Sequence, residues 1–296
     1  MLCLTFLSNL INGISLGSVY AIIALGYTMV YGIAKMLNFA HGDVIMVGAY
    51  MCFCAMSYLG LPPIAGILLA VVVCTLLGIV IEKLAYKPLR AASSLAVLIT
   101  AIGVSFFLQN SALLIFKADP KVFPSVIDLP SVKLFDGQLI ISSVSIVTVL
   151  VSAVIMIALT LFISRSKVGK AMRAVSEDKD AAQLMGINVN GTISVTFAIG
   201  SGLAAIAGVL LCSAYPTLMP TTGSMPGIKA FTAAVFGGIG SIPGAMLGGI
   251  LLGVIEIFAK AYISTQLSDA IVFAVLIIVL LIKPTGLLGK AISEKV

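Results

Sequence analysis

The sequence predicts an all-α fold, a polytopic bundle of transmembrane helices, and three observations support that prediction. The chain has 296 residues, of which 60% are hydrophobic and only 9% are charged, whereas soluble domains carry about 25% charged residues. Its apolar residues fall into runs of about 20, the length that crosses a bilayer as a helix. The polar connections between the runs are short. We therefore expect one transmembrane domain over residues 1–296, with about 8–9 spans.

The spans follow from the positions of the apolar runs. The N-terminal run lacks the basic start of a cleavable signal, so we interpret it as the first span. The expected spans cover residues 10–33, 43–59, 63–81, 95–116, 139–163, 192–212 and 267–282, together with a longer stretch at 228–261. Gly237, Gly238, Gly240 and Gly244 interrupt that stretch. We expect it to be broken or re-entrant, because irregular backbone at membrane depth is tolerated only where it faces protein or water.

The basic residues predict the orientation. Three follow residue 81, five follow residue 163, three lie in the C-terminal tail, and Lys35 follows the first span, so twelve of the 17 basic residues share one side. The positive-inside rule assigns that side to the cytoplasm. We therefore expect the N-terminus outside the cell membrane and the C-terminus in the cytoplasm. The net charge of +6 is then a sign of orientation rather than of nucleic-acid binding.

The most charged part of the chain lies at about residues 164–190. Val168, Met172 and Val175 recur through it at helical spacing, which predicts one or two short amphipathic helices at the membrane surface. Such a segment either caps the bundle or docks a partner protein. A compact helix end favours docking, because Gly186 can adopt a positive φ at the turn. The candidate contact residues are Arg173, Glu177, Asp178, Asp180, Ala181, Ala182 and Gly186.

Several motifs resemble those of a known family. Asp180, Ala181 and Ala182, followed by Gly186, are similar to the Glu-Ala-Ala and Gly signature of the coupling helices in ABC importer permeases, with Asp in place of Glu. The blocks at 12–32, 37–43, 48–50, 87–90, 98–105, 108–110 and 237–244 resemble, in order, those of the branched-chain amino acid family of these permeases. The ordered set covers essentially the whole chain, which makes it far more specific than one glycine-rich block.

The resemblance implies the permease subunit of an ABC importer in a prokaryotic cell membrane, carrying leucine, isoleucine, valine or related small polar solutes. It implies a homologous sister permease, two cytoplasmic ATPase subunits and an extracytoplasmic substrate-binding protein. ATP and Mg would be bound by the ATPases, so we expect no cofactor in this chain. The Gly169-Lys170 and Gly289-Lys290 pairs do not fit a phosphate-binding loop. The resemblance leaves a urea or short-amide permease open as an alternative.

The candidate translocation pathway is polar. Three of its residues, Asn12, Thr100 and Asn110, lie within apolar spans, and the last two belong to one polar stripe of the fourth span. The other two, Asn38 and His41, lie in the break after the first span. Such side chains either line a path for a small zwitterion or bind helices together. The same break contains Asp43, which would cap its own helix or contribute to a gate.

Three acids fall within or beside the apolar spans, namely Asp43, Glu256 and Asp269. Each needs a reason, because a charge at the centre of a bilayer costs about 2.5–3.5 kcal/mol on insertion scales. Glu256 and Lys260 are four residues apart on one helix, so they would neutralise one another. The alternative is a proton-coupling carboxylate, as in an ion-driven secondary transporter.

Enzymatic and metal chemistry are not expected. The chain has one histidine and five cysteines, and the cysteines lie in apolar runs where they act as small buried hydrophobes. The sequence shows no set of residues that could act together as a nucleophile, its general base and an orienting group. We therefore expect no catalytic residue and no metal site.

Overall fold

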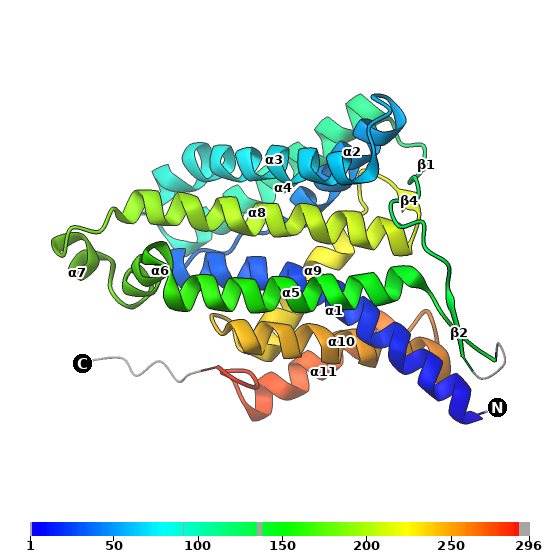
Figure 1. The fold of residues 1–296 in the computed structure, drawn as a ribbon. Coiled ribbons are helices and arrows are strands. Elements are labelled where there is room, and N and C mark those ends of the chain that lie inside the picture. Colours follow the sequence, from blue (N-terminus) through cyan, green and yellow to red (C-terminus); the bar gives the residue numbers. More distant parts are fainter. Residues whose placement is uncertain (1, 91, 135–137, 290–296) are drawn as a thin grey trace.

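The computed structural model describes residues 2–90, 92–134 and 138–289, and it is an elongated bundle of helices (Figure 1). Six helices in this described part are long and apolar enough to cross a membrane, which confirms the polytopic all-α prediction. They are α1 (Leu2–Ala34), α3 (Pro63–Ile81), α4 (Ser94–Phe116), α5 (Ser143–Arg165), α8 (Val189–Ala214) and α10 (Ile242–Tyr262). Two shorter apolar helices, α2 (His41–Ser57) and α11 (Ser268–Ile282), accompany them.

The two ends of the bundle differ (Figure 1). At one end the amphipathic helices α6 (Lys167–Glu177) and α7 (Lys179–Leu184) project beyond the spans. We call α6, α7 and the turn at 185–187 the knob, and this end the knob end. The other end, the hairpin end, carries the N-terminus and a hairpin of β2 (Val132–Leu134) and β3 (Leu139–Ile141). A second antiparallel pair there joins β1 (Lys121–Val122) to β4 (Thr217–Leu218).

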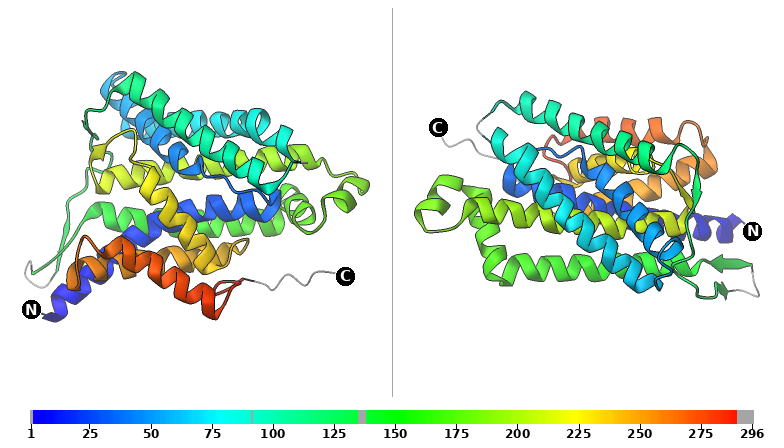
Figure 2. Two further views of the ribbon diagram at one scale, coloured as in Figure 1. Left: turned by 180° about the vertical axis from the view of Figure 1, so that it is seen from behind. Right: turned by 90° about the horizontal axis from the view of Figure 1, so that it is seen from above.

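Helix α1 is the centre of the bundle. It packs most extensively on α10 and also contacts α8, α5 and α9 (Ser224–Gly237). In an 18-residue apolar stretch of α1, 94% of the residues are buried, whereas in the corresponding stretch of α4 only 11% are buried. Figure 2 shows α4 and α11 at opposite edges of the bundle. The faces of α4 that are exposed in this chain would be covered by lipid or by another subunit.

Glycines bring α1 and α10 into backbone contact. A Cβ added to Gly17 would lie 2.6 Å from the Cα of Ile250, and one added to Gly253 would lie 2.2 Å from the Cα of Gly17. Small residues permit this approach in membranes, where close van der Waals packing drives helix association. We call this contact the glycine seam.

The long glycine-rich stretch is broken, as its sequence predicts. It forms α9 and α10, separated at residues 238–241, where Gly238 has φ 108° and Gly240 has φ 94°. Only glycine adopts such angles readily. The break therefore reverses the chain and lays α9 against α10.

One expected span begins in the wrong place. The sequence predicts a helix from residue 139, whereas Leu139–Ile141 is strand β3, with Leu139 opposite Leu134 of β2, and α5 starts only at Ser143. A short apolar run fits a strand as well as a helix, and here the hairpin partner decides. The first helix also begins earlier than expected, at Leu2.

The clustering of basic residues at one end holds for the described part of the chain. Ten lie in segments at the knob end: Lys35, Lys83, Lys87, Arg90, Arg165, Lys167, Lys170, Arg173, Lys179 and Lys283. Lys290 and Lys295, which also enter the orientation argument, lie outside the described residues.

Candidate functional site

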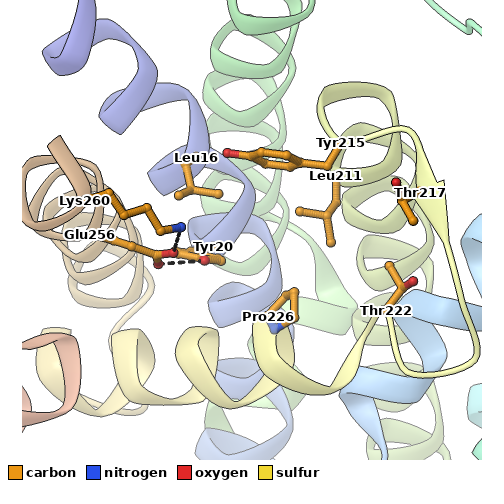
Figure 3. A pocket seen from close by; sticks show the side chains of 9 residues that line it. All are labelled: Leu16, Tyr20, Leu211, Tyr215, Thr217, Thr222, Pro226, Glu256 and Lys260. Atoms are coloured by element: carbon orange, nitrogen blue, oxygen red, sulfur yellow. Dashed lines mark hydrogen bonds and ion pairs between the residues drawn. The ribbon is translucent and has the colours of Figure 1, made fainter. Parts of the chain in front are cut away.

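A pocket of about 260 Å³ opens between helices at the hairpin end (Figure 3). Its walls come from α1, α8, the connection after α8, the start of α9 and α10. The lining residues are Leu16, Tyr20, Leu211, Tyr215, Thr217, Thr222, Pro226, Glu256 and Lys260. We call this the outer pocket. It combines an apolar wall, several hydroxyl groups and one charged corner.

Glu256 is the centre of the charged corner. Its side chain is only 1% exposed, and it accepts three hydrogen bonds. Tyr20 donates to Oε2 at 2.8 Å, while Lys229 and Lys260 donate to Oε1 at 2.8 and 2.6 Å. A buried carboxylate is tolerated when it is paired and hydrogen-bonded in this way.

Lys229 extends the cluster to a fourth charge. Its Nζ lies 2.7 Å from Oδ1 of Asp269, at the start of α11, as well as beside Glu256. Two lysines, Lys229 and Lys260, therefore face two carboxylates, and the cluster is formally neutral. The sequence predicts the Glu256–Lys260 pair, which the structure confirms, but it does not reveal Lys229 or Tyr20 as partners. The one available signal is that Lys229 lies in an apolar segment and needs a counter-ion.

A second, smaller pocket of about 90 Å³ lies toward the knob end. Its lining residues are Thr28, Met29, Gly32, Ile33, Ile163, Met172, Arg173, Ser176, Gly240 and Ile242. Among the residues that the structure describes, the buried Oγ1 of Thr28 has no hydrogen-bond partner. We call this the inner pocket.

The two pockets flank the same stretch of α1. Tyr20 lines the outer pocket and Thr28 the inner one, a separation of about 12 Å along the helix axis at 1.5 Å per residue. Between them Ile22, Ile23 and Leu25 are fully or almost fully buried. The molecule thus has a cavity on either side of a closely packed stretch of α1.

The connection between α1 and α2 is a buried polar network. Tyr86 donates a hydrogen bond to Oδ1 of Asn38 at 2.9 Å. The ring of His41 packs edge-on against Tyr27, with the ring centroids 4.7 Å apart. Gln109 donates to Oδ1 of Asp43 at 2.8 Å. The N-cap position of α2 is occupied by Ala40, not by Asp43, so the network rather than a side-chain cap holds this carboxylate.

The five predicted pathway residues are dispersed. Asn38 and His41 are buried in the network just described. Asn12 and Asn110 are exposed, and Asn110 donates to the backbone carbonyl of Phe106 in its own helix at 2.7 Å. Thr100 is partly exposed on α4. None of the five lines the outer or the inner pocket.

The knob is shaped by two local motifs. Oδ1 of Asp178 accepts from the backbone N–H groups of Asp180 and Ala181, both at 2.9 Å, which caps the start of α7. At the other end Gly186 has φ 81° and its N–H bonds to the carbonyl of Gln183, while the N–H of Ile187 bonds to that of Ala182. This pattern is a Schellman motif, and it confirms the positive φ expected at Gly186.

The tip of the knob is apolar and exposed. Leu184 is 89% exposed and Met185 is 83% exposed, whereas Ala182 is buried. The predicted contact residues Arg173, Glu177, Asp180 and Ala181 lie on the exposed surface of the knob. Sequence analysis missed Leu184 and Met185, because an apolar residue at helical spacing is normally assigned to the packed face.

A lysine attaches the knob to α1. Nζ of Lys179 donates a hydrogen bond to the backbone carbonyl of Ala34, the last residue of α1, at 2.9 Å. Burial, together with the charges of Arg90 and Lys35, lowers the pKa of Lys179 below the usual value of lysine. A cation at a helix C-terminus also interacts favourably with the helix dipole. The knob is therefore directly bonded to the helix that lines both pockets.

A bundle of helices long and apolar enough to cross a membrane, with a charged pocket between them, is the architecture expected of a transporter permease. The chain belongs to the family described as branched-chain amino acid transport system / permease component, whose model matches residues 9–280. This result confirms the resemblance inferred from the motifs.

Individual relatives match almost the whole chain. The chain is 48% identical to the high-affinity branched-chain amino acid transport system permease protein BraD of Pseudomonas aeruginosa, over 98% of both chains. It is 46% identical to the corresponding protein LivH of Escherichia coli strain K12, over 99% of this chain and 98% of LivH. A probable branched-chain amino acid transport permease protein, LivH of Methanocaldococcus jannaschii, is 28% identical over 90% of this chain and 88% of that protein.

Proposed function

We propose that this chain is the permease subunit of an ABC importer and forms the pathway for leucine, isoleucine and valine. The observation that carries the proposal is the outer pocket, whose charged corner at Glu256 and Lys260 faces an apolar wall that includes Leu16 and Leu211. An amino acid with a branched apolar side chain has the same division into a charged and an apolar part. The names of the relatives point to the same solutes.

The proposed orientation places the hairpin end outside the cell membrane and the knob end in the cytoplasm. The basic residues at the knob end support it through the positive-inside rule. The outer pocket then faces an extracytoplasmic binding protein that delivers the solute. The whole chain acts as one permease domain, with the segment at about 164–190 as its coupling element.

The proposed partners are a homologous sister permease and two cytoplasmic ATPase subunits. The ATPases bind ATP and Mg, and this chain contributes no catalytic residue or cofactor. The knob docks on an ATPase through Leu184 and Met185, whose exposed apolar surface suits a hydrophobic groove. Exposed charged and small residues of the knob fix its orientation, namely Arg173, Glu177, Asp178, Asp180, Ala181 and Gly186, and the buried Ala182 supports them from behind.

The proposed mechanism is alternating access along α1. Movement of the ATPases displaces the knob, and the bond from Lys179 to the carbonyl of Ala34 transmits the displacement to α1. Because α1 lines both pockets and contacts α10 through the glycine seam, its movement opens one pocket while it closes the other. Asn38 and His41 lie beside this moving helix. We retain Asn12, Thr100 and Asn110 as candidate contacts with the pathway at the surface shared with the sister permease.

The competing proposal, an ion-driven transporter that uses Glu256, has less support. Tyr20, Lys229 and Lys260 already occupy this carboxylate, so neutralisation of the two lysines accounts for it. A urea or short-amide permease is also disfavoured, because these solutes carry no net or zwitterionic charge to match the charged corner.

The decisive experiment is leucine uptake by the complete transporter in proteoliposomes, with ATP and ion gradients varied separately. We expect leucine uptake to require ATP on the side of the membrane that carries the ATPases, which is the vesicle interior. We expect this uptake to persist when ionophores collapse the ion gradients. Uptake that persists without ATP but is lost with the gradients would overturn the proposal. Competition by isoleucine and valine, but not by urea, tests the solute class.

A further inference from the structure

The carboxylate of Glu256 is almost fully used by the protein itself. A carboxylate has two oxygens and about four acceptor positions, and three are filled by Tyr20, Lys229 and Lys260. The side chain is 1% exposed. Glu256 is therefore a fixed support of the outer pocket rather than the group that meets the solute.

Lys260 is in the opposite situation. An ammonium group has three N–H donors, and within the described part of the chain Nζ of Lys260 makes one hydrogen bond, to Oε1 of Glu256 at 2.6 Å. Its side chain is 35% exposed and lines the outer pocket (Figure 3). Donors that are not used by Glu256 are thus available to a solute in the pocket.

Lys260 does not have a carboxylate to itself within this formally neutral cluster. Glu256 is shared between two ammonium groups, because Lys229 bonds to the same oxygen. Lys229 has a second counter-ion in Asp269, but Asp269 is 42% exposed, so water screens much of its charge. A carboxylate that entered the pocket would meet an ammonium group whose counter-ion, Glu256, is shared with Lys229.

The rest of the pocket fits the remainder of an amino acid. Leu16, Leu211 and Pro226 form an apolar surface, while Tyr215 and Thr217 add hydroxyl groups near the opening. A volume of about 260 Å³ has room for a solute of this size.

We propose that Lys260 binds the carboxylate of the transported solute, and that this permease itself therefore selects carboxylates over amides of the same shape. The proposal rests on the proposed transport function and assigns its specificity to one side chain. The selection is independent of any selection by a binding protein. L-leucine and L-leucinamide are the appropriate probes, because they share the side chain and the ammonium group and differ in the carboxylate.

The test uses the permease complex with its sister permease and ATPases in nanodiscs, without binding protein. The five native cysteines are replaced, and Thr217→Cys places one thiol in the outer pocket. The rate at which a water-soluble thiol reagent labels this position is measured with either probe present. We expect leucine to slow labelling at a concentration about tenfold or more below that required for leucinamide, as a charge-assisted hydrogen bond predicts.

Variants of Lys260 assign the difference to this side chain. Lys260→Gln, which retains a donor but removes the charge, is expected to make leucine protect no better than leucinamide, whereas Lys260→Arg retains the preference. Lys133→Gln is the matched control, because Lys133 is an exposed lysine of the hairpin end outside the pocket. This variant should leave the preference for leucine over leucinamide unchanged. Unaltered melting of Lys260→Gln excludes misfolding, and if that variant fails to fold, Lys260→Met, which also removes the charge, is tested in its place with the same expected loss of preference.

Three results would overturn the inference. These are equal protection by the two probes with Lys260 present, protection by neither probe, and a leucine preference that survives Lys260→Gln. ATP-driven leucine uptake is measured in parallel with the same complex and its binding protein in proteoliposomes. Normal uptake combined with any of the three rejects the role of Lys260 and retains the proposed function, whereas absent uptake rejects the proposed function itself.

Discussion

The hairpin end and the knob end of the bundle depart from the usual pattern of burial in opposite ways. At the hairpin end a carboxylate, Glu256, is 1% exposed within the bundle, and at the knob end two apolar side chains, Leu184 and Met185, are more than 80% exposed. Buried charge requires partners, and a large exposed apolar patch indicates a binding surface. The comparison shows a buried charge that the protein itself satisfies at one end and an apolar surface that the described chain leaves uncovered at the other.

The largest expected effect tests the buried charge. Glu256→Ala should lower the free energy of unfolding by about 3–5 kcal/mol, because it leaves Lys229 and Lys260 without their shared counter-ion. Thermal melting of the purified complex measures it, with the exposed acid Asp119→Ala as the control. Adding Lys229→Met to Glu256→Ala should recover part of the loss. Equal stability of the single and double variants would mean that the charges are not coupled.

The next effect tests the exposed apolar tip. Leu184→Asp with Met185→Asp should weaken association with the ATPases by roughly 100-fold, since burying each apolar side chain is worth about 1.5–3 kcal/mol. Melting of the permease alone should not change. Co-purification of the ATPases and leucine uptake are the measurements. Val122→Asp, at a residue 80% exposed at the hairpin end, is the matched control; if both changes reduce association equally, the tip has no special role.

A smaller effect concerns the glycine seam that joins the two ends. Gly253→Ala should cost about 1–3 kcal/mol of stability, because the new Cβ would lie 2.2 Å from backbone atoms of Gly17. Gly103→Ala is the control, since a Cβ at Gly103 meets no atom within 4 Å, and it should be neutral or slightly stabilising. Melting temperatures of the two variants decide between a close-packed and a loose seam.

The smallest effect concerns the turn behind the tip. Gly186→Ala should cost about 1 kcal/mol, because φ 81° is unfavourable for a residue with a Cβ. Gly186→Asn should cost less, since asparagine tolerates this conformation. Limited proteolysis of the knob detects the local change, and identical cleavage of both variants and the parent chain would indicate that the turn is not under this constraint.

How far the sequence predicts these two ends depends on the separation of the interacting residues. The Glu256–Lys260 pair and the positive φ of Gly186 follow from local spacing, and both are confirmed. Tyr20 and Lys229, which bond to the same carboxylate, lie 236 and 27 residues away. Helical periodicity contains no information on which distant helix faces which, so these partners required the structure.

The apolar residues show a similar division. Strand β3 and the exposed tip at Leu184 both occupy short apolar runs whose fate depends on neighbours: a hairpin partner for the strand, and the absence of any covering helix in the described chain for the tip. The long spans are different, because their length alone commits them to helix. The transmembrane framework was therefore predictable, whereas the two functional ends were predictable only in part.

The glycine seam has a consequence for the entropy of transport. Gly13, Gly17, Gly249 and Gly253 have no side-chain rotamers, so a tilt or shift of α1 against α10 changes contacts at these four positions without freezing or releasing a χ angle of their own. Side-chain entropy then contributes little to the barrier for moving α1. In the proposed mechanism that barrier then depends on the polar contacts of α1, from Tyr20 to Glu256 and from Lys179 to Ala34, which are the proposed points of solute and ATPase action.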